Sequence, residues 1–338
     1  MLRPIFAAAF AAMLALPAEA QTSPTQTSPT PTWPTPTWPT RPVTMVVPFA
    51  AGGPMDVVGR IMATGLSEQL GQQVIIENVG GGGGMTGAAR VAKAAPDGSQ
   101  FVLGNVGTHA VSQSLSKNPP YNVAADFAPI ALIADLSLVL VTRKDLPAAD
   151  LQEFIAYAKA NEDKMQFGSA SAGSATHLGC ALLNAAIGVN VTHIPYRGGA
   201  PAMQDLVAGR IDYLCIDTPI AIPLIEGAQI KALAILTRGR SASLPNLPSA
   251  QEQGLANFEA ANWAAFFMRK GTPAPIVSKL AAASAAATGS EAVQKRMKEI
   301  GVDPVAPDRR SPEYLATFVE AEIAKWAGPV KASGLATD

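Results

Sequence analysis

The chain has 338 residues, of which 48% are hydrophobic and 15% are charged, and its formal net charge is −1. This composition is sufficient for the buried cores of two domains and argues against a disordered chain. The 25 basic and 26 acidic residues form no long run of either sign, so the sequence shows no sign of the basic face typical of nucleic-acid-binding proteins.

The first twenty residues have the pattern of a secretory signal peptide. Arg3 precedes an apolar run over 5–16, which is too short to cross a membrane. The small residues Ala18 and Ala20 then provide a cleavage pattern. We therefore expect residues 1–20 to be removed near Ala20 and the mature protein to be exported and soluble in the periplasm.

Residues 21–40 form a linker rich in Thr, Pro and Trp, which contains the repeat PTWPTPTWPT. Proline at this density favours extended polyproline II geometry. We interpret the segment as a spacer on which Trp33 and Trp38 are exposed.

Strand and helix patterns alternate from Arg41 onward. Short runs of apolar residues predict strands at 43–47, 73–77, 101–104, 137–142, 165–168, 191–194, 212–216, 231–236 and 263–268. Amphipathic segments between them predict helices, with start signals at Asp150, Ser174 and Ser311. This alternation predicts α/β architecture with largely parallel sheets, and the length of the chain favours two sheets over one.

The stretch VTMVVPFAAGGPMDVVGR, over 43–60, predicts a strand, a glycine turn and the start of a helix. Gly52 and Gly53 permit close backbone approach, and Pro54 suits the first turn of a helix. Such a unit aims free backbone N–H groups and the positive end of a helix dipole at one point, which suits an anion. Asp56 lies in the same turn, and we expect it mainly to hold the loop by accepting some of these N–H groups.

Two cysteines are available for pairing, Cys180 on a predicted helix and Cys215 on a predicted strand. They admit either a disulfide or two buried thiols, and we favour the thiols because buried cysteine is common. The three histidines, His109, His177 and His193, have no metal-ligand spacing with each other or with the cysteines. The sequence therefore indicates no metal site.

The segment VVPFAAGGPMDVVGR resembles the Bug family, the extracytoplasmic solute receptors of tripartite tricarboxylate transporters. The resemblance runs from about Arg41 to the C-terminus and includes IIENVGGGGGMTGAARVAKAAPDG, LGNVGTHAVSQSL, FGSASAGSATHLGCALL and THIPYRGGAPAMQDLVAGRIDYLCIDTP. It implies a type II periplasmic-binding-protein fold, in which two α/β lobes are joined by two crossover strands around a ligand cleft. Lobe one is expected at 41–143 plus 259–338 and lobe two at 144–258, with crossovers at Leu138–Arg143 and Asn262–Met268.

The resemblance also implies that backbone N–H groups from both lobes hold a small organic carboxylate, at helix starts where such groups lack intrahelical partners. The candidate ligand-binding residues on this reading are Ala51, Gly52, Gly53, Asp56, Thr108, Ser174, Ala175, Thr176, Arg197, Asp217 and Thr218. Thr108 is expected to donate its hydroxyl to the ligand. Arg197 is expected either to bind a second carboxylate or to lie on the surface or between the lobes. His109 and His177 are interpreted as packing or capping residues.

Two loops depart from the usual pattern of the family. VGGGGGM, at 79–85, replaces Arg-Pro-Gly-Ala-Gly-Gly-Asn, so we expect a looser loop that lacks a polar side chain at position 85. Ser171 and Ala172 stand where a Gly-Asn pair is common. Because both changes can alter specificity, the resemblance leaves the identity of the carboxylate open.

The expected partners are the carboxylate and the membrane permease subunits of a tripartite tricarboxylate transporter, with the receptor acting as a monomer and without cofactor or nucleic acid. A GxGxxG match in the glycine run lacks the acidic residue that a dinucleotide site requires about 20 residues later. The alternative function is a ligand-sensing receptor for a two-component system. A serine hydrolase is less favoured, because FGSASAGSATH lacks the G-x-S-x-G motif and places Ser174 and His177 on one helix.

Overall fold

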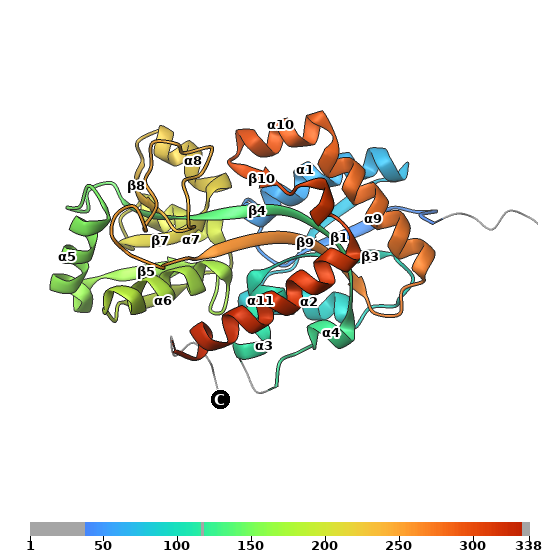
Figure 1. Cartoon of the computed structure of the whole chain (residues 1–338), viewed down its shortest axis with the longest axis horizontal. Helices are drawn as coiled ribbons and strands as arrows, with labels where there is room; N and C mark the ends of the chain where they lie inside the picture. The colour runs from blue at the N-terminus through green and yellow to red at the C-terminus, as the bar shows by residue number, and fades with distance from the viewer. Residues whose placement is uncertain (1–37, 116–117, 333–338) are drawn as a thin grey trace, which may run out of the picture. The chain divides into compact units, whose positions relative to one another are not determined.

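The computed structural model describes residues 38–115 and 118–332, so the expected signal peptide and Trp33 lie outside the described residues. The strands are β1 (Val43–Val47), β2 (Val74–Asn78), β3 (Gln100–Asn105), β4 (Phe127–Arg143), β5 (Gln166–Ser169), β6 (Thr192–Pro195), β7 (Tyr213–Asp217), β8 (Ile230–Ile235), β9 (Ala261–Arg269) and β10 (Val302–Pro304). The α-helices are α1 (Pro54–Leu70), α2 (Met85–Ala92), α3 (Ser112–Leu115), α4 (Val123–Asp126), α5 (Leu151–Asn161), α6 (Ala175–Ile187), α7 (Gly199–Val207), α8 (Thr218–Glu226), α9 (Ala274–Gly289), α10 (Glu291–Glu299) and α11 (Pro312–Ala332) (Figure 1).

The first lobe is built on the strand order β2-β1-β3-β9-β4. Strands β1, β2 and β3 are parallel, whereas β9 runs antiparallel to both β3 and β4. Helices cover both faces, so alternate side chains of one strand enter different cores: Met45 packs with α1 and α9, and Val46 packs with α2 and α11. Strands that are buried on both faces explain why these segments read as continuous apolar runs.

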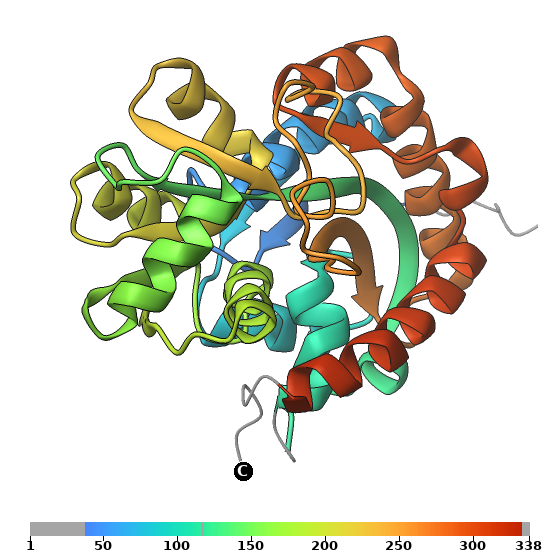
Figure 2. The same cartoon turned by 60° about the vertical axis from the view of Figure 1, so that its left-hand side comes forward.

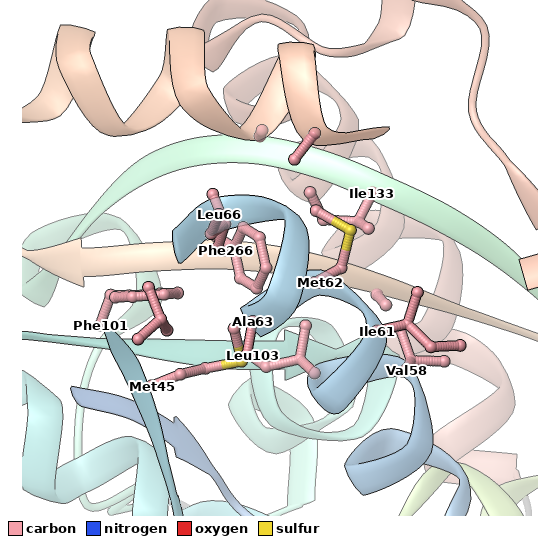
Figure 3. Close-up of a cluster of buried hydrophobic side chains, with 14 of the residues drawn as sticks. Met45, Val58, Ile61, Met62, Ala63, Leu66, Phe101, Leu103, Ile133 and Phe266 are labelled. Carbon is pink, nitrogen blue, oxygen red and sulfur yellow. The ribbon is translucent and has the colours of Figure 1, made fainter. Parts of the chain in front are cut away.

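The core under α1 shows how the first lobe is held together (Figure 3). Met62 and Leu66 of α1 are fully buried against the sheet, where Phe101 of β3 and Phe266 of β9 meet edge to face with ring centroids 5.1 Å apart. Burial of side chains of this size contributes about 1.5–3 kcal/mol each. This packing fixes the axis of α1 and, with it, the position of the helix start near β1.

The second lobe is built on β7, β5 and β6, which are parallel, and on β8, which pairs antiparallel with β4 (Figure 2). Side chains of β7 alternate between two cores, because Tyr213 and Cys215 face α5 and α6 whereas Leu214 and Ile216 face α7 and α8. Helices α6, α7 and α8 follow β5, β6 and β7 in the chain, so they start at the edge of the sheet where these parallel strands end.

One strand, β4, belongs to both lobes. Its residues up to Ser137 pair with β9, and from Leu138 onward they pair with β7 and β8. Strand β9 is the second crossover, and its entry is tied to the second lobe by the hydrogen bond from Ala260 N to Leu236 O (2.7 Å). The sequence predicted only the part of β4 over 137–142 and missed its first half, along with β10, because a 17-residue strand that is mostly buried shows no clear alternation.

Cys180 of α6 and Cys215 of β7 form a disulfide, with Cα atoms 5.3 Å apart, so the sequence-based preference for two thiols was wrong. The two residues are 35 positions apart in the chain. Only the packing of α6 against β7 brings them together, and this contact has no local sequence signal.

Trp38 also differs from expectation, because it is part of the first lobe and not an exposed residue of a spacer. Its indole N–H donates to Gly98 O at 3.1 Å, and its ring packs against the core under α1. The ordered lobe therefore begins inside the segment assigned to the linker.

Candidate functional site

The starts of four helices meet at one cavity between the lobes. The residues that line it are Phe49, Pro54, Met55, Asn105, Ala170, Ser174, Ala175, Thr176, Gly199 and Asp217. They include first-turn or cap residues of α1, α6, α7 and α8. The volume of the cavity is only about 10 Å³, so the lobes leave little free space between them. Because each helix start carries unpaired N–H groups and a partial positive charge, this arrangement suits a small anion.

Asp56 organises the start of α1. Its Oδ2 accepts from Gly52 N (2.8 Å) and from Arg60 Nε (2.8 Å), and its Oδ1 accepts from Asn78 Nδ2 (3.0 Å). Burial alone raises the pKa of this carboxyl, but the hydrogen bonds from Arg60, Gly52 and Asn78 together hold the pKa below its ordinary value. Asp56 thus holds the loop as an anion, and it does not line the cavity.

The loop residues Ala51, Gly52 and Gly53 lie beside the cavity and do not line it. Ala51 and Gly52 are exposed, and the Gly52 N–H is already bound to Asp56. The buried Gly53 N–H lies 3.4 Å from Ala50 O. The part of this unit that reaches the cavity is the first turn of α1, where Met55 offers a backbone N–H without an intrahelical acceptor.

At the end of β3, Asn105 lines the cavity and Thr108 does not. The Thr108 hydroxyl accepts from Asn105 N (2.9 Å) and lies 2.8 Å from His109 Nδ1. Thr108 N donates to Asn105 Oδ1 (3.1 Å), which orients the amide of Asn105. The Nδ2 group of Asn105 then has no partner among the described residues, so it is the donor available to a ligand. The sequence analysis missed Asn105.

The start of α6 places three predicted residues in the cavity wall. Ser174 caps the helix through its hydroxyl, which accepts from His177 N (3.3 Å). The Thr176 hydroxyl accepts from Ala170 N (2.8 Å), which ties the helix start to the loop after β5. The N–H groups of Ala175 and Thr176 precede the first intrahelical bond and have no acceptor in the described chain.

Asp217 is the one acidic side chain that lines the cavity. It ends β7, caps α8 without a side-chain hydrogen bond to that helix, and is only 2% exposed. Its Oδ1 accepts from Asn262 Nδ2 at 2.9 Å. Burial, partly offset by this hydrogen bond, raises the pKa of the Asp217 carboxyl to about 6.

Thr218 and Arg197 lie outside the cavity. The Thr218 hydroxyl donates to Gly301 O (2.7 Å) and so links α8 of the second lobe to the first lobe. Arg197 is exposed, and its carbonyl oxygen lies 3.2 Å from the point where a Cβ atom of Gly80 would stand. Its backbone therefore contributes to the contact between lobes, which agrees with the interlobe interpretation of this residue.

The two loops that depart from the family pattern meet each other across the cleft. Gly82–Gly84 form a 3-10 turn, and Gly83 N donates to the Ser171 hydroxyl at 3.0 Å. Gly83 has φ of +68°, and a Cβ atom there would lie 2.7 Å from Ala172 O. The glycine run was expected to be loose, but in the structure it forms a defined turn that contacts the loop before α6.

The histidines and serines of the second lobe do not form a nucleophile–base pair with access to the cavity. The His177 ring accepts from Gly173 N through Nδ1 (3.0 Å) and stacks on His193, so it does not bind the Ser174 hydroxyl. His193 Nε2 lies 2.7 Å from the Ser169 hydroxyl, but Ser169 is fully buried and does not line the cavity. In the first lobe, His109 is buried in an aromatic cluster, as its interpretation as a packing residue expects. Among the described residues, no group of His, Cys, Asp and Glu is placed to hold a metal ion.

Comparison with known families identifies one family over most of the chain. The model of the tripartite tricarboxylate transporter family receptors matches residues 58–335. A protein from the TAR-I ttuE-ttuC' intergenic region of Agrobacterium vitis is 40% identical over 293 residues, which cover 87% of this chain and 84% of that protein. The BugT protein of Bordetella pertussis is 35% identical, with 87% and 90% of the two chains covered.

Solved structures show the same relationship. The periplasmic binding protein BugD superposes with a TM-score of 0.86 at 38% identity, covering 89% of this chain and all of that one. MatC from Rhodopseudomonas palustris, solved with bound malate, gives a TM-score of 0.84 at 38% identity, with 87% and 100% covered. R. palustris Rpa4515, solved with adipate, superposes with a TM-score of 0.83 at 36% sequence identity, and the match covers 88% of this chain and 98% of that one. The two-lobed periplasmic-binding-protein fold is therefore confirmed.

Proposed function

The chain belongs to the receptor family of tripartite tricarboxylate transporters, and on this premise we propose that it captures a small organic carboxylate between its lobes and delivers it to such a transporter. The observation that carries this proposal is the convergence of the starts of α1, α6, α7 and α8 on one buried cavity. Unpaired N–H groups from both lobes favour an anion, and among the described residues that line the cavity Asp217 is the one acidic side chain. In the described part of the chain, no helix is long and apolar enough to cross a membrane.

Capture follows from contacts that a ligand makes to both lobes at once. Met55 N and the Asn105 amide belong to the first lobe, and the N–H groups of Ala175 and Thr176 belong to the second. A carboxylate that binds all of them stabilises the closed arrangement over any open one. Rotation of the lobes about β4 and β9 opens the cavity, with the proposed boundaries of lobe two at 144–258. Both sides of the cavity come from one chain, so we expect a monomer.

Short dicarboxylates are the ligand class that we expect. MatC and Rpa4515, two related receptors solved with bound ligands, hold malate and adipate, which carry a carboxylate at each end. The start of α1 and the end of β3 line the cavity from the first lobe, and the starts of α6, α7 and α8 line it from the second. Each side can bind one end of such an acid through N–H groups.

A thermal-shift screen tests the proposal. The protein is purified from the periplasm after export and is mixed with mono-, di- and tricarboxylates, and the matching amides serve as neutral controls. A ligand that binds only the folded state raises Tm by mass action. We expect a rise with dicarboxylates and none with their amides. Turnover of ester or amide substrates without any rise for carboxylates would replace the receptor with an enzyme.

A further inference from the structure

We propose that Asp217 is protonated in the complex and donates a hydrogen bond from its carboxyl group to the carboxylate of the ligand, so that capture of the anion takes up one proton. This inference rests on the proposed function and adds a specificity-determining residue to the same site. It also makes ligand affinity dependent on pH.

The first step is that Asp217 has no cation to balance a negative charge. It lines the cavity together with Pro54 and Met55 of α1, Asn105 of β3 and Gly199 of α7, none of which is charged. On the neighbouring strands, Leu138 of β4 stands opposite Asp217, and Asn262 of β9 is its hydrogen-bond partner. No charged side chain of the described residues forms an ion pair with Asp217, and none contributes to the change in its pKa.

Titratable groups near the cavity on α1 and α6 are bound to other partners. Asp56 and Arg60 of α1 pair with each other. His177 of α6 accepts from a backbone N–H and stacks on His193.

Strands β4 and β7 pair with each other, and at the end of this pair that is farthest from Asp217, Arg143 of β4 forms an ion pair with Asp212, which precedes β7. Arg269, at the other end of β9, pairs with Asp126. Asp205 of α7 pairs with Arg210. The charge of Asp217, if it forms, is therefore left without a counter-ion in the cavity.

The second step is that the hydrogen bonds around Asp217 select one of its oxygens for the ligand. Val106 N donates to Asn262 Oδ1 at 3.4 Å, so the amide of Asn262 points its Nδ2 group at Asp217 Oδ1 (2.9 Å). Oδ1 is therefore an acceptor within the protein. The carboxyl also accepts from the backbone N–H of Asp217 itself. Oδ2 makes no hydrogen bond to another residue in the described chain, so we place the proton of the neutral carboxyl on Oδ2.

The third step is energetic. Burial disfavours an ionised carboxylate and raises the pKa of Asp217 to about 6 before any ligand is considered. A ligand carboxylate beside it adds a second negative charge, and two carboxylates at close range hold one proton between them. The proton comes from solvent and stays on Asp217 Oδ2. The ligand gains a donor, and the mutual repulsion of two anions is removed.

The pH dependence follows from proton linkage. Below pH 6 the carboxyl already holds its proton, so binding takes up no proton on Asp217. Above pH 6 the free protein has lost the proton and the complex keeps it, so Kd rises by about tenfold per pH unit. Lower pH therefore favours capture, and higher pH favours release.

Titration calorimetry with succinate, malate and adipate tests the proposal. Each acid is titrated at pH 6.5, 7.5 and 8.5, in pairs of buffers with different ionisation enthalpies, which report the protons taken up. For the wild-type protein we expect Kd to rise by about tenfold per pH unit and close to one proton to be taken up. Asp217→Asn supplies a permanent donor, so its Kd should be independent of pH and its proton uptake absent. Asp145→Asn, at a side chain that is 71% exposed, is the matched control and should behave as wild type.

Four other outcomes each give a decision. If an acid binds wild type with equal Kd at all three pH values and without proton uptake, Asp217 is not protonated in the complex and this inference is wrong, while the proposed function stands. A preference for malate over succinate that is lost in Asp217→Asn, again without proton uptake, would show an ionised Asp217 that accepts from the hydroxyl of malate. If none of the three acids binds, the proposed ligand class fails and this inference fails with it. If Asp217→Asn does not fold, proton uptake by wild type alone decides.

Discussion

Asn105 and Thr108 are three residues apart at the end of β3, but only Asn105 lines the cavity. Both side chains can donate to a carboxylate. The Thr108 hydroxyl is bound to the backbone of Asn105, whereas the amide of Asn105 uses only its oxygen in the turn. At the scale of single residues, the groups left for a ligand are those that the protein has not already used.

The replacement Asn105→Ala tests this difference. It removes the free Nδ2 donor, and the loss of one hydrogen bond to a charged group costs about 1.5–3 kcal/mol, so Kd for the bound dicarboxylate should rise by roughly ten- to a hundredfold. Calorimetry gives Kd, and thermal unfolding checks that the protein folds. Asn161→Ala, at an amide that bonds Tyr157 O on α5, is the control and should leave Kd unchanged. An unchanged Kd for Asn105→Ala would remove this amide from the site.

At the scale of elements, backbone contact between loops brings the lobes together. The turn at Gly82–Gly84 and the loop before α6 approach so closely that only a residue without a side chain fits at Gly83. The hydrogen bond from Gly83 N to the Ser171 hydroxyl crosses the same contact. Glycine at this position therefore serves closure of the cleft as well as the turn itself.

Gly83→Ala should weaken ligand binding because it holds the loops apart. A Cβ atom 2.7 Å from Ala172 O forces a displacement, and overpacking of this kind costs about 1–3 kcal/mol, or roughly a five- to a hundredfold rise in Kd. Small-angle scattering should show less compaction on addition of the dicarboxylate than for wild type. Gly209→Ala is the matched control, since φ is +71° but no atom lies within 4 Å. An equal rise in Kd in both variants would mean that backbone strain, and not closure of the cleft, weakens binding.

The disulfide joins two elements that both reach the cavity. It links α6, which starts at Ser174, to β7, which ends at Asp217. Its closed loop spans 35 residues, and cross-links of this kind stabilise the folded state by about 2–4 kcal/mol.

Replacing both cysteines by alanine should therefore lower the free energy of unfolding by about this amount. Urea denaturation measures the change. Addition of a reducing agent to wild type should give a similar loss, and the alanine variant should not respond to it. A wild-type protein with two titratable thiols before reduction would contradict the pairing.

At the scale of the whole molecule, the lobes share β4, so neither sheet is complete without the strand that also joins them. Three histidines, of which His109 and His177 are buried and His193 is half-buried, are distributed over this structure. Burial lowers the pKa of His109 to about 3 and of His193 to about 4. Burial and the neighbouring His193 lower the pKa of His177 to about 3.

These pKa values predict loss of stability in acid. Each histidine is neutral in the folded protein, but in the unfolded chain it binds a proton below about pH 6.5. The unfolded state thus binds more protons as pH falls from about 6.5 toward the folded-state values, and each one lowers the free energy of unfolding by about 1.4 kcal/mol per pH unit. Asp217, with its raised pKa, acts in the opposite direction between about pH 6 and 4. Urea titrations at pH 7, 6 and 5 should show that the free energy of unfolding decreases as the pH falls. In His109→Phe this decrease should be smaller.

Local patterns in the sequence determined most of the elements. The apolar runs predicted β1 and β7, and the Ser174 cap predicted the start of α6, because strand alternation and helix capping depend on neighbouring residues. The resemblance to the Bug family, and not a local pattern, assigned Ser174, Ala175 and Thr176 at this helix start to the ligand. The glycine turn before α1 indicated an anion site, since a helix start carries free N–H groups whatever it packs against.

Tertiary structure alone decided which groups the cavity presents. Asp56 accepts from the Gly52 N–H, and the Thr108 hydroxyl binds the backbone of Asn105. Met55 therefore lines the cavity in place of Gly52, and Asn105 lines it in place of Thr108. The first half of β4 and the disulfide also depend on partners far along the chain. The physical reason is that a local pattern fixes backbone conformation, whereas the choice of hydrogen-bond and packing partners depends on which distant segments the fold brings together.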